Sequence, residues 1–336
     1  MGRLALRIAA MAASAVVAAG LAATPSRAAS RAAPITGGGV PTSAYVNAPA
    51  AAPAGVKNLR RFWTADRMRA ATPMRAPAST STPATKALAK PTGPPRTTEP
   101  RLPSSKAIAA AARAAGADVS AQAVLNRTVG KAFFYDPIDG KEHMCSGATV
   151  NSDKGRLVIT AGHCVSSGFG LWMQGFVFAP AYDNGAPFGY WVAAGLAART
   201  DWVFGGLPAG DVGVAIMDGT PIVSVVGGNG LSWNQQYGAF TDVFGYPTGG
   251  ETQGTCAGNI LPGIEANQVG MFPCDHWSNG SSGSPMLQSY GLIGPGLGYV
   301  NSVVSTVYTP ITDHVYGPYF DDINAGLLYY AETISP

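Results

Sequence analysis

The sequence predicts an all-β domain over residues 128–336, preceded by a long N-terminal region of different composition. From Thr128 onward, short apolar or alternating runs are separated by Gly, Pro, Asn and Asp, a pattern typical of short strands joined by tight turns. Many such strands at close spacing favour a β-barrel or a β-sandwich. A change in the sign of the charge coincides with the same boundary, which supports placing the start of the domain there.

The strands of this domain are predicted from its apolar runs. They are expected near residues 129–135, 146–151, 156–161, 175–180, 190–196, 212–217, 221–226, 240–245, 267–273, 285–289 and 298–308. A C-terminal helix should follow, because Asp321 or Asp322 can cap it. Its apolar face would consist of Ile323, Leu327 and Leu328.

Residues 1–28 have the pattern of a secretory signal peptide. Arg3 and Arg7 give a basic start, and an Ala-rich apolar run follows from Ile8 to Ala23. Small residues come next, so cleavage is expected after Ala28. An uncleaved anchor is the alternative, but the run is short for a spanning helix of about 20 strongly apolar residues. The protein is therefore expected to be secreted and extracellular, without membrane association once the signal is removed.

Residues 29–127 are rich in Ala, Pro, Thr and Arg, and most of them show neither helical nor strand periodicity. Such a composition buries too little apolar surface to offset the entropy of ordering, so the segment is predicted to be largely disordered. A short helix is possible at Ser105 to Ala115, where serines can cap its start.

Charge divides the chain at residue 127. Residues up to 127 carry 17 Lys/Arg and 3 Asp/Glu, and the later residues carry 5 and 16, so the two parts have net charges of +14 and −11. A basic segment ahead of an acidic domain suggests a propeptide held partly by long-range attraction. A solvated linker and a cell-wall stalk are the alternatives. Nucleic-acid binding is not expected, because the basic residues lie in the Pro-rich segment and the folded domain is acidic.

Three residues of the folded domain have the chemistry of a catalytic triad. A hydroxyl becomes a nucleophile when a base takes its proton, an acid orients that base and N–H donors stabilise the oxyanion. Ser282 lies in the run GSSGSP, whose glycines permit a tight turn that directs the N–H groups of Gly280 and Ser282 toward one point. His163 lies in TAGHC, at the end of a predicted strand. Asp211 opens an apolar strand 48 residues later, where a buried acid needs hydrogen-bond partners.

Each of these three signals is weak alone, since a glycine-rich turn, a structural histidine and a turn aspartate are all common.

The four cysteines lie between residues 145 and 274, and in an exported protein an even number can form two disulfides. Three pairings are possible, and the sequence does not choose among them. No C-x2-C spacing is present, so no zinc site and no cofactor are expected. A calcium site among the loop aspartates is possible, but no ligand spacing argues for one, and no metal ligand is assigned.

Together, the runs FFYD, CSGATV, ITAGHCV, DVGVAIM and GSSGSP resemble the chymotrypsin-like serine peptidases, and more closely the secreted bacterial branch that includes the glutamyl endopeptidases. The resemblance implies two six-stranded antiparallel β-barrels with the active site in the cleft between them. It also implies that His163 is the general base and acid, Asp211 its orienting carboxylate and Ser282 the nucleophile. The N–H groups of Gly280 and Ser282 would form the oxyanion hole.

The same resemblance implies the disulfides Cys145–Cys164 and Cys256–Cys274. It also shows one departure: digestive-type relatives have an aspartate before the nucleophile, which receives the new amino terminus on activation. Ser281 stands there in this chain, so activation through that ion pair is not expected.

Side-chain specificity is less clear from the sequence. His276 lies six residues before the nucleophile, where trypsin-like relatives have a selective acid. Glutamyl endopeptidases place a histidine on the strand after the nucleophile, but the stretch from Gly298 contains none and has Asn301 instead. His276 and Asn301 are the candidate pocket residues, and no preference for glutamate is assigned.

The sequence therefore predicts an extracellular serine endopeptidase that hydrolyses peptide bonds through an acyl-enzyme on Ser282. Its expected partners are protein or peptide substrates and its own propeptide. A protease-fold binding protein that has lost activity and an enzyme that hydrolyses esters are the two alternatives.

Overall fold

The structure is a computed structural model that describes residues 42–75, 89–116, 126–275, 277–308 and 311–336. The predicted signal peptide lies outside the described residues. Within the described ranges, no helix has both the length and the apolar composition needed to cross a bilayer.

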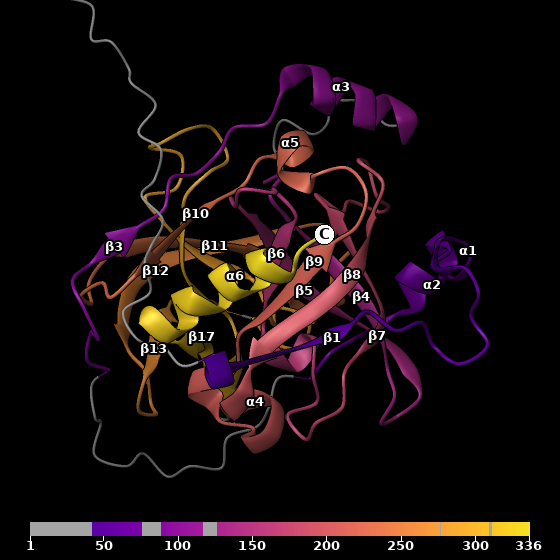
Figure 1. The fold of residues 1–336 in the computed structure, drawn as a ribbon. Coiled ribbons are helices and arrows are strands. Elements are labelled where there is room, and N and C mark those ends of the chain that lie inside the picture. The colour runs from indigo at the N-terminus through magenta and orange to yellow at the C-terminus, as the bar shows by residue number, and fades with distance from the viewer. Residues whose placement is uncertain (1–41, 76–88, 117–125, 276, 309–310) are drawn as a thin grey trace, which may run out of the picture. The chain divides into compact units, whose positions relative to one another are not determined.

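The first sheet closes into a six-stranded barrel in the order β8-β7-β4-β5-β6-β9, because β8 also pairs with β9 (Figure 1). Its strands are β4 (Val129–Asp136), β5 (Lys141–Val150), β6 (Leu157–Thr160), β7 (Gln174–Pro180), β8 (Trp191–Arg199) and β9 (Gly213–Met217). Aromatic side chains fill the barrel, among them Phe134 and Phe176, whose rings stack with centroids 6.0 Å apart. Burying such large apolar side chains is the main contribution to the stability of the barrel.

The second sheet contains nine strands in the order β16-β17-β13-β12-β11-β14-β15-β10-β3. They are β3 (Arg96–Thr97), β10 (Gly230–Trp233), β11 (Phe240–Gly245), β12 (Gly254–Pro262), β13 (Gln268–Phe272), β14 (Pro285–Gln288), β15 (Tyr299–Val303), β16 (Thr306–Tyr308) and β17 (Ile311–Pro318). The sheet curls so that β17 approaches β15, where the Ser302 hydroxyl donates to the Pro318 carbonyl at 2.8 Å. The predicted fold class, two β-barrels and a C-terminal helix, is confirmed.

The helices are short except at the C-terminus. They are α1 (Leu59–Phe62), α2 (Ala65–Ala70), α3 (Ser105–Ala114), α4 (Thr200–Gly205), α5 (Ile222–Val226) and α6 (Asp322–Ile334), with 3-10 turns η1 (Thr42–Ala44), η3 (Gly162–Cys164), η4 (Pro208–Gly210) and η5 (Pro247–Gly249). The Asp321 carboxylate caps α6 by accepting from the N–H groups of Ile323 and Asn324, as predicted. Leu327 and Leu328 are buried on its inner face.

Three element predictions differ from the structure. The run at residues 221–226 was expected to be a strand but forms α5, because an apolar run this short does not distinguish a buried helix from a strand. The single strand expected at 298–308 is divided into β15 and β16. The strands β10, β12 and β17 were not predicted, and in β12 a high content of Gly, Asn and Pro hides the apolar pattern.

The prediction of a largely disordered segment is wrong for residues 42–75 and 89–116. Strand β1 (Tyr45–Pro49) pairs with β8, β2 (Thr72–Pro73) pairs with β5, and β3 pairs with β10. These strands extend sheets that the domain already provides, so the segment needs few apolar residues of its own. Trp63, between α1 and α2, and Met68, on α2, are buried against the first barrel. Whether this segment is removed as a propeptide stays a prediction.

The buried tyrosines should make the fold sensitive to alkali. Burial raises the pKa of Tyr45 to about 12 and holds the pKa of Tyr246 well above its usual range. A raised folded-state pKa contributes stability that is present below the ordinary tyrosine pKa of 10.0 and is lost as the pH rises toward 12. Denaturation at several pH values should therefore show stability falling over this window, and Tyr45→Phe should reduce the slope. An unchanged slope in the variant would contradict the assignment.

Candidate active site

His163 and Asp211 form a buried pair on the first barrel. His163 lies in η3, directly after β6, and Asp211 follows η4. The His163 Nδ1 atom is 2.8 Å from Asp211 Oδ2, and the His163 backbone N–H donates to Oδ1 at 2.7 Å. Both side chains are buried, at 3% and 0% exposure. An ionised carboxylate accepts only, so His163 Nδ1 carries a proton and Nε2 keeps a free lone pair in the neutral ring.

A third partner of the carboxylate comes from the second barrel. The Ser305 hydroxyl, located between β15 and β16, donates to Asp211 Oδ2. This serine was not among the predicted site residues, because it is 94 positions from Asp211 and no local motif marks it. The buried Asp211 therefore has three hydrogen-bond donors around it, which offset the cost of removing its charge from water.

The imidazole is also held by packing. The Trp202 ring of α4 meets the His163 ring edge to face at a centroid distance of 6.2 Å, and its Nε1 donates to the Ser166 carbonyl at 3.1 Å. A Cβ atom at Gly162 would lie 2.8 Å from both Asp211 Oδ1 and the Trp202 ring. Only glycine at this position lets the turn approach the carboxylate so closely.

The serine loop is built around glycines. Gly280 and Gly283 have φ angles of 88° and 83°, in the left-handed region that favours glycine. A Cβ atom at Gly283 would lie 2.1 Å from Thr160 Oγ1, so this residue must be glycine on steric grounds as well. Between them, Ser282 is 1% exposed.

Strand β5 holds the histidine turn and the serine loop side by side. Its Ser146 N–H donates to the Ser282 carbonyl at 2.8 Å, and the Ser146 hydroxyl donates to the Gly280 carbonyl at 2.9 Å. The preceding residue, Cys145, forms a disulfide with Cys164. Consecutive residues of one strand thus anchor the two loops that carry the predicted base and nucleophile.

His163 and Ser282 do not form a hydrogen bond in this structure. His163 Nε2 and Ser282 Oγ are both buried, and neither has a hydrogen-bond partner among the described residues. Such bonds are often formed only when substrate binds. The structure therefore pairs His163 with Asp211 and brings the Ser282 loop to the same strand.

The two predicted oxyanion donors differ in their partners. The Gly280 N–H donates to the carbonyl of Met74, in the N-terminal segment, at 3.1 Å. The Ser282 N–H makes no hydrogen bond with any described residue.

The remaining predicted residues are His276, Asn301 and the second pair of cysteines. His276 falls outside the described residues. Asn301 is buried on β15, where its Nδ2 donates to the Ser232 carbonyl at 3.4 Å and so links β15 to β10. The second disulfide, Cys256–Cys274, joins β12 to the residues after β13.

Two groups of potential metal ligands occur within the described ranges. One consists of His163 and the first disulfide, whose bonded sulfurs cannot act as thiolate ligands. The other consists of Asp136, Asp139 and His143, in the hairpin between β4 and β5. Its polar atoms already have partners, since Asp136 accepts from the Ile138 N–H and Asp139 binds His143.

Comparisons with known proteins place the fold. The chain is 31% identical to the thermostable serine protease AL20 from an extremophilic microorganism, over 62% of this chain and 99% of that one, with a TM-score of 0.57. Against the protease Anisep from Arthrobacter nicotinovorans the identity is 32%, over 62% and 96% of the chains, with a TM-score of 0.56. A Glu endopeptidase matches in fold at 17% identity and a TM-score of 0.51, over 70% and 98%. No family profile and no curated protein sequence matches the chain.

Proposed function

This chain belongs to the chymotrypsin-like family of serine proteases, and we propose that it is a secreted endopeptidase that cleaves peptide bonds through an acyl-enzyme on Ser282. The observation that carries the proposal is the buried His163–Asp211 pair, which leaves the His163 Nε2 lone pair free beside the anchored serine loop. The two disulfides support secretion, because such bonds persist in oxidising compartments.

In the first half-reaction, Ser282 Oγ attacks the carbonyl carbon of the scissile bond while its proton passes to His163 Nε2. Asp211 stabilises the resulting imidazolium through Nδ1. The negative oxygen of the tetrahedral intermediate would accept from the N–H groups of Gly280 and Ser282. When the C–N bond breaks, the leaving amine takes the proton from Nε2 and an ester to Ser282 remains.

In the second half-reaction, water attacks the ester. His163 Nε2 takes a proton from the water and then returns it to Ser282 Oγ as the acid is released. The cycle uses groups of this chain, the substrate and one water molecule, whose proton and hydroxyl end in the two products.

Turnover of two substrates tests the proposal. The secreted chain, once its N-terminal segment has been removed by proteolysis, should hydrolyse an unstructured protein and a simple ester, and Ser282→Ala should abolish both activities. Hydrolysis of the ester alone would favour an esterase. Activity on neither substrate would favour a binding protein and contradict the proposal.

Ser305 should act as a positioning residue. Ser305→Ala removes a donor to the Asp211 carboxylate, and a hydrogen bond to a charged group contributes about 1.5–3 kcal/mol, so kcat should fall at least about tenfold with little change in KM. Ser302→Ala is the matched control, because the Ser302 hydroxyl donates to the Pro318 carbonyl instead. Both variants should lose comparable stability. An equal loss of kcat in the two variants would show that Ser305 has only a structural role.

A further inference from the structure

We propose that residues 63–74, here called the strap, inhibit the precursor by occupying the Gly280 N–H, an inference that rests on the function proposed above. Thr72 and Pro73 form β2, which pairs in parallel with β5 at His143 and Met144. At the end of the strap, the Met74 N–H donates to the Met144 carbonyl at 2.8 Å, and the Met74 carbonyl accepts from the Gly280 N–H at 3.1 Å.

The position of the Met74 carbonyl explains the inhibition. The developing oxyanion of a substrate needs donors that are free to receive it, and removing one such donor is costly for catalysis. While Met74 holds the Gly280 N–H, a substrate carbonyl cannot bind there. The strap also packs against η5, the turn next to Gly280, because a Cβ atom at Gly249 would lie 2.6 Å from Pro73 Cγ and a Cβ atom at Gly280 would lie 3.1 Å from the Gly249 nitrogen.

The peptide bond after Met74 in the strap is not positioned for cleavage by Ser282. Its Met74 carbonyl reaches only one of the two proposed oxyanion donors, since the Ser282 N–H makes no hydrogen bond with any described residue. Ser282 Oγ likewise contacts no polar atom of the strap. The strap therefore blocks the site without entering the geometry that leads to acyl transfer.

Apolar burial holds the strap in place. Trp63 and Met68 are 2% and 4% exposed, and the Trp63 ring packs 5.8 Å from Phe133 in the wall of the first barrel. The Trp63 Nε1 donates to the Gly175 carbonyl at 2.6 Å.

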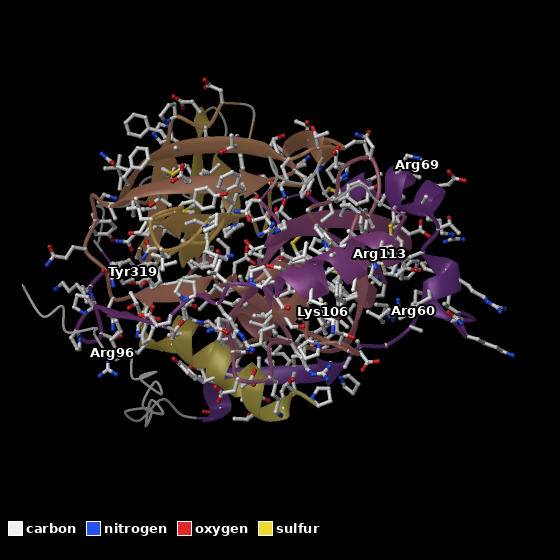
Figure 2. The ribbon with its side chains drawn as sticks, turned by 90° about the horizontal axis from the view of Figure 1, so that it is seen from above. Arg60, Arg69, Arg96, Lys106, Arg113 and Tyr319 are labelled. Carbon is white, nitrogen blue, oxygen red and sulfur yellow. A yellow bond between two sulfur atoms is a disulfide. The ribbon has the colours of Figure 1, made fainter. Side chains whose placement is uncertain are left out.

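Charge contributes much less to this contact. Figure 2 shows Arg69, a residue of the strap, at the outer edge of the view, and its side chain is exposed. The ion pair of Arg67 with Glu142 is half-exposed, and pairs of this kind contribute little. The strap should consequently stay bound at high salt, and also after the chain is cut between residues 117 and 127, because none of its contacts depends on that connection.

The rate at which a fluorophosphonate probe labels Ser282 in the full secreted chain tests the strap. Trp63→Ala should raise this rate about tenfold or more, because losing a buried aromatic anchor increases the population with a free Gly280 N–H. Met74→Pro, which removes the N–H that pairs with Met144, should act in the same direction and serves if Trp63→Ala does not fold. The control Tyr45→Ala removes an aromatic side chain from β1, away from Gly280, and should leave the rate unchanged.

Hydrogen exchange at the Gly280 amide provides a readout that does not depend on activity. The amide should be protected in the wild type, also after cleavage between residues 117 and 127, and should exchange faster in Trp63→Ala. Equal exchange and equal labelling in the wild type and both strap variants would overturn the proposal that the strap inhibits the precursor. Fast labelling of a chain that is cut between residues 117 and 127 but still holds its N-terminal segment would overturn it as well. If exchange responds as expected but no sample takes label, even after the segment is removed by proteolysis, the proposed function fails and the Gly280 contact stands.

Discussion

Replacing Asp211 by Asn should lower kcat/KM for a peptide substrate by about 10⁴-fold, with most of the loss in kcat. The carboxylate accepts from the His163 backbone N–H, His163 Nδ1 and the Ser305 hydroxyl. A side-chain amide has only one acceptor oxygen, and its NH₂ group would face His163 Nδ1 as a donor. The imidazole would then carry its proton on Nε2 and could not accept one from Ser282.

The matched control is Asp218→Asn, which makes the same charge change on an exposed residue directly after β9. It should retain nearly full kcat/KM. Both variants should unfold at denaturant concentrations close to that of the wild type. If Asp211→Asn kept more than about a tenth of the wild-type kcat, the role of Asp211 in setting the histidine tautomer would be refuted.

Glu251→Ala should destabilise the fold by about 3–5 kcal/mol, the cost of leaving a buried charge without its partner. Lys131 is 1% exposed on β4, and its Nζ lies 2.9 Å from Glu251 Oε1. The ammonium group also lies over the rings of Tyr182 and Tyr246, at 4.5 and 5.4 Å from their centroids. Without Glu251, the partners of this buried cation among the described residues are the two rings and the Gly249 carbonyl.

The pH dependence of this variant follows from the same contacts. Burial lowers the pKa of Lys131 from its usual 10.5, while Glu251 acts in the opposite direction. Without Glu251 the folded pKa should fall further. Between that lowered pKa and pH 10.5 the unfolded chain binds more protons than the folded chain, so stability should rise with pH over this window.

Denaturant titration of Glu251→Ala and of the double variant Lys131→Met/Glu251→Ala checks both statements. The double variant removes the uncompensated charge and should recover most of the lost stability. Equal stabilities of the single and double variants would show that Lys131 does not carry the effect.

The sequence was sufficient for contacts that local motifs encode. TAGHC and GDV identified His163 and Asp211, and GSSGSP identified the glycine turns around Ser282. The strands of the first barrel were also predictable, because their apolar runs end at clear turn residues. Contacts between distant segments were not predictable in this way.

The contact of Ser305 with Asp211 is one that the sequence could not predict, since its hydroxyl reaches Asp211 only when the second barrel packs against the first. The docking of the N-terminal segment on the domain is another contact that the sequence could not predict. Its composition indicates disorder, because composition does not take account of the binding surface that the domain provides for Trp63 and for strands such as β1. Isolated aromatic residues such as Tyr45 and Trp63 in an Ala- and Pro-rich segment are the signal that would have indicated docking.

Mass-spectrometric mapping of a fluorophosphonate adduct tests the central claim most directly. After the N-terminal segment is removed, one probe per molecule should be found on Ser282, and His163→Ala should lose nearly all labelling while remaining folded. Stoichiometric labelling of another residue, or unchanged labelling in His163→Ala, would contradict the claim that His163 activates Ser282.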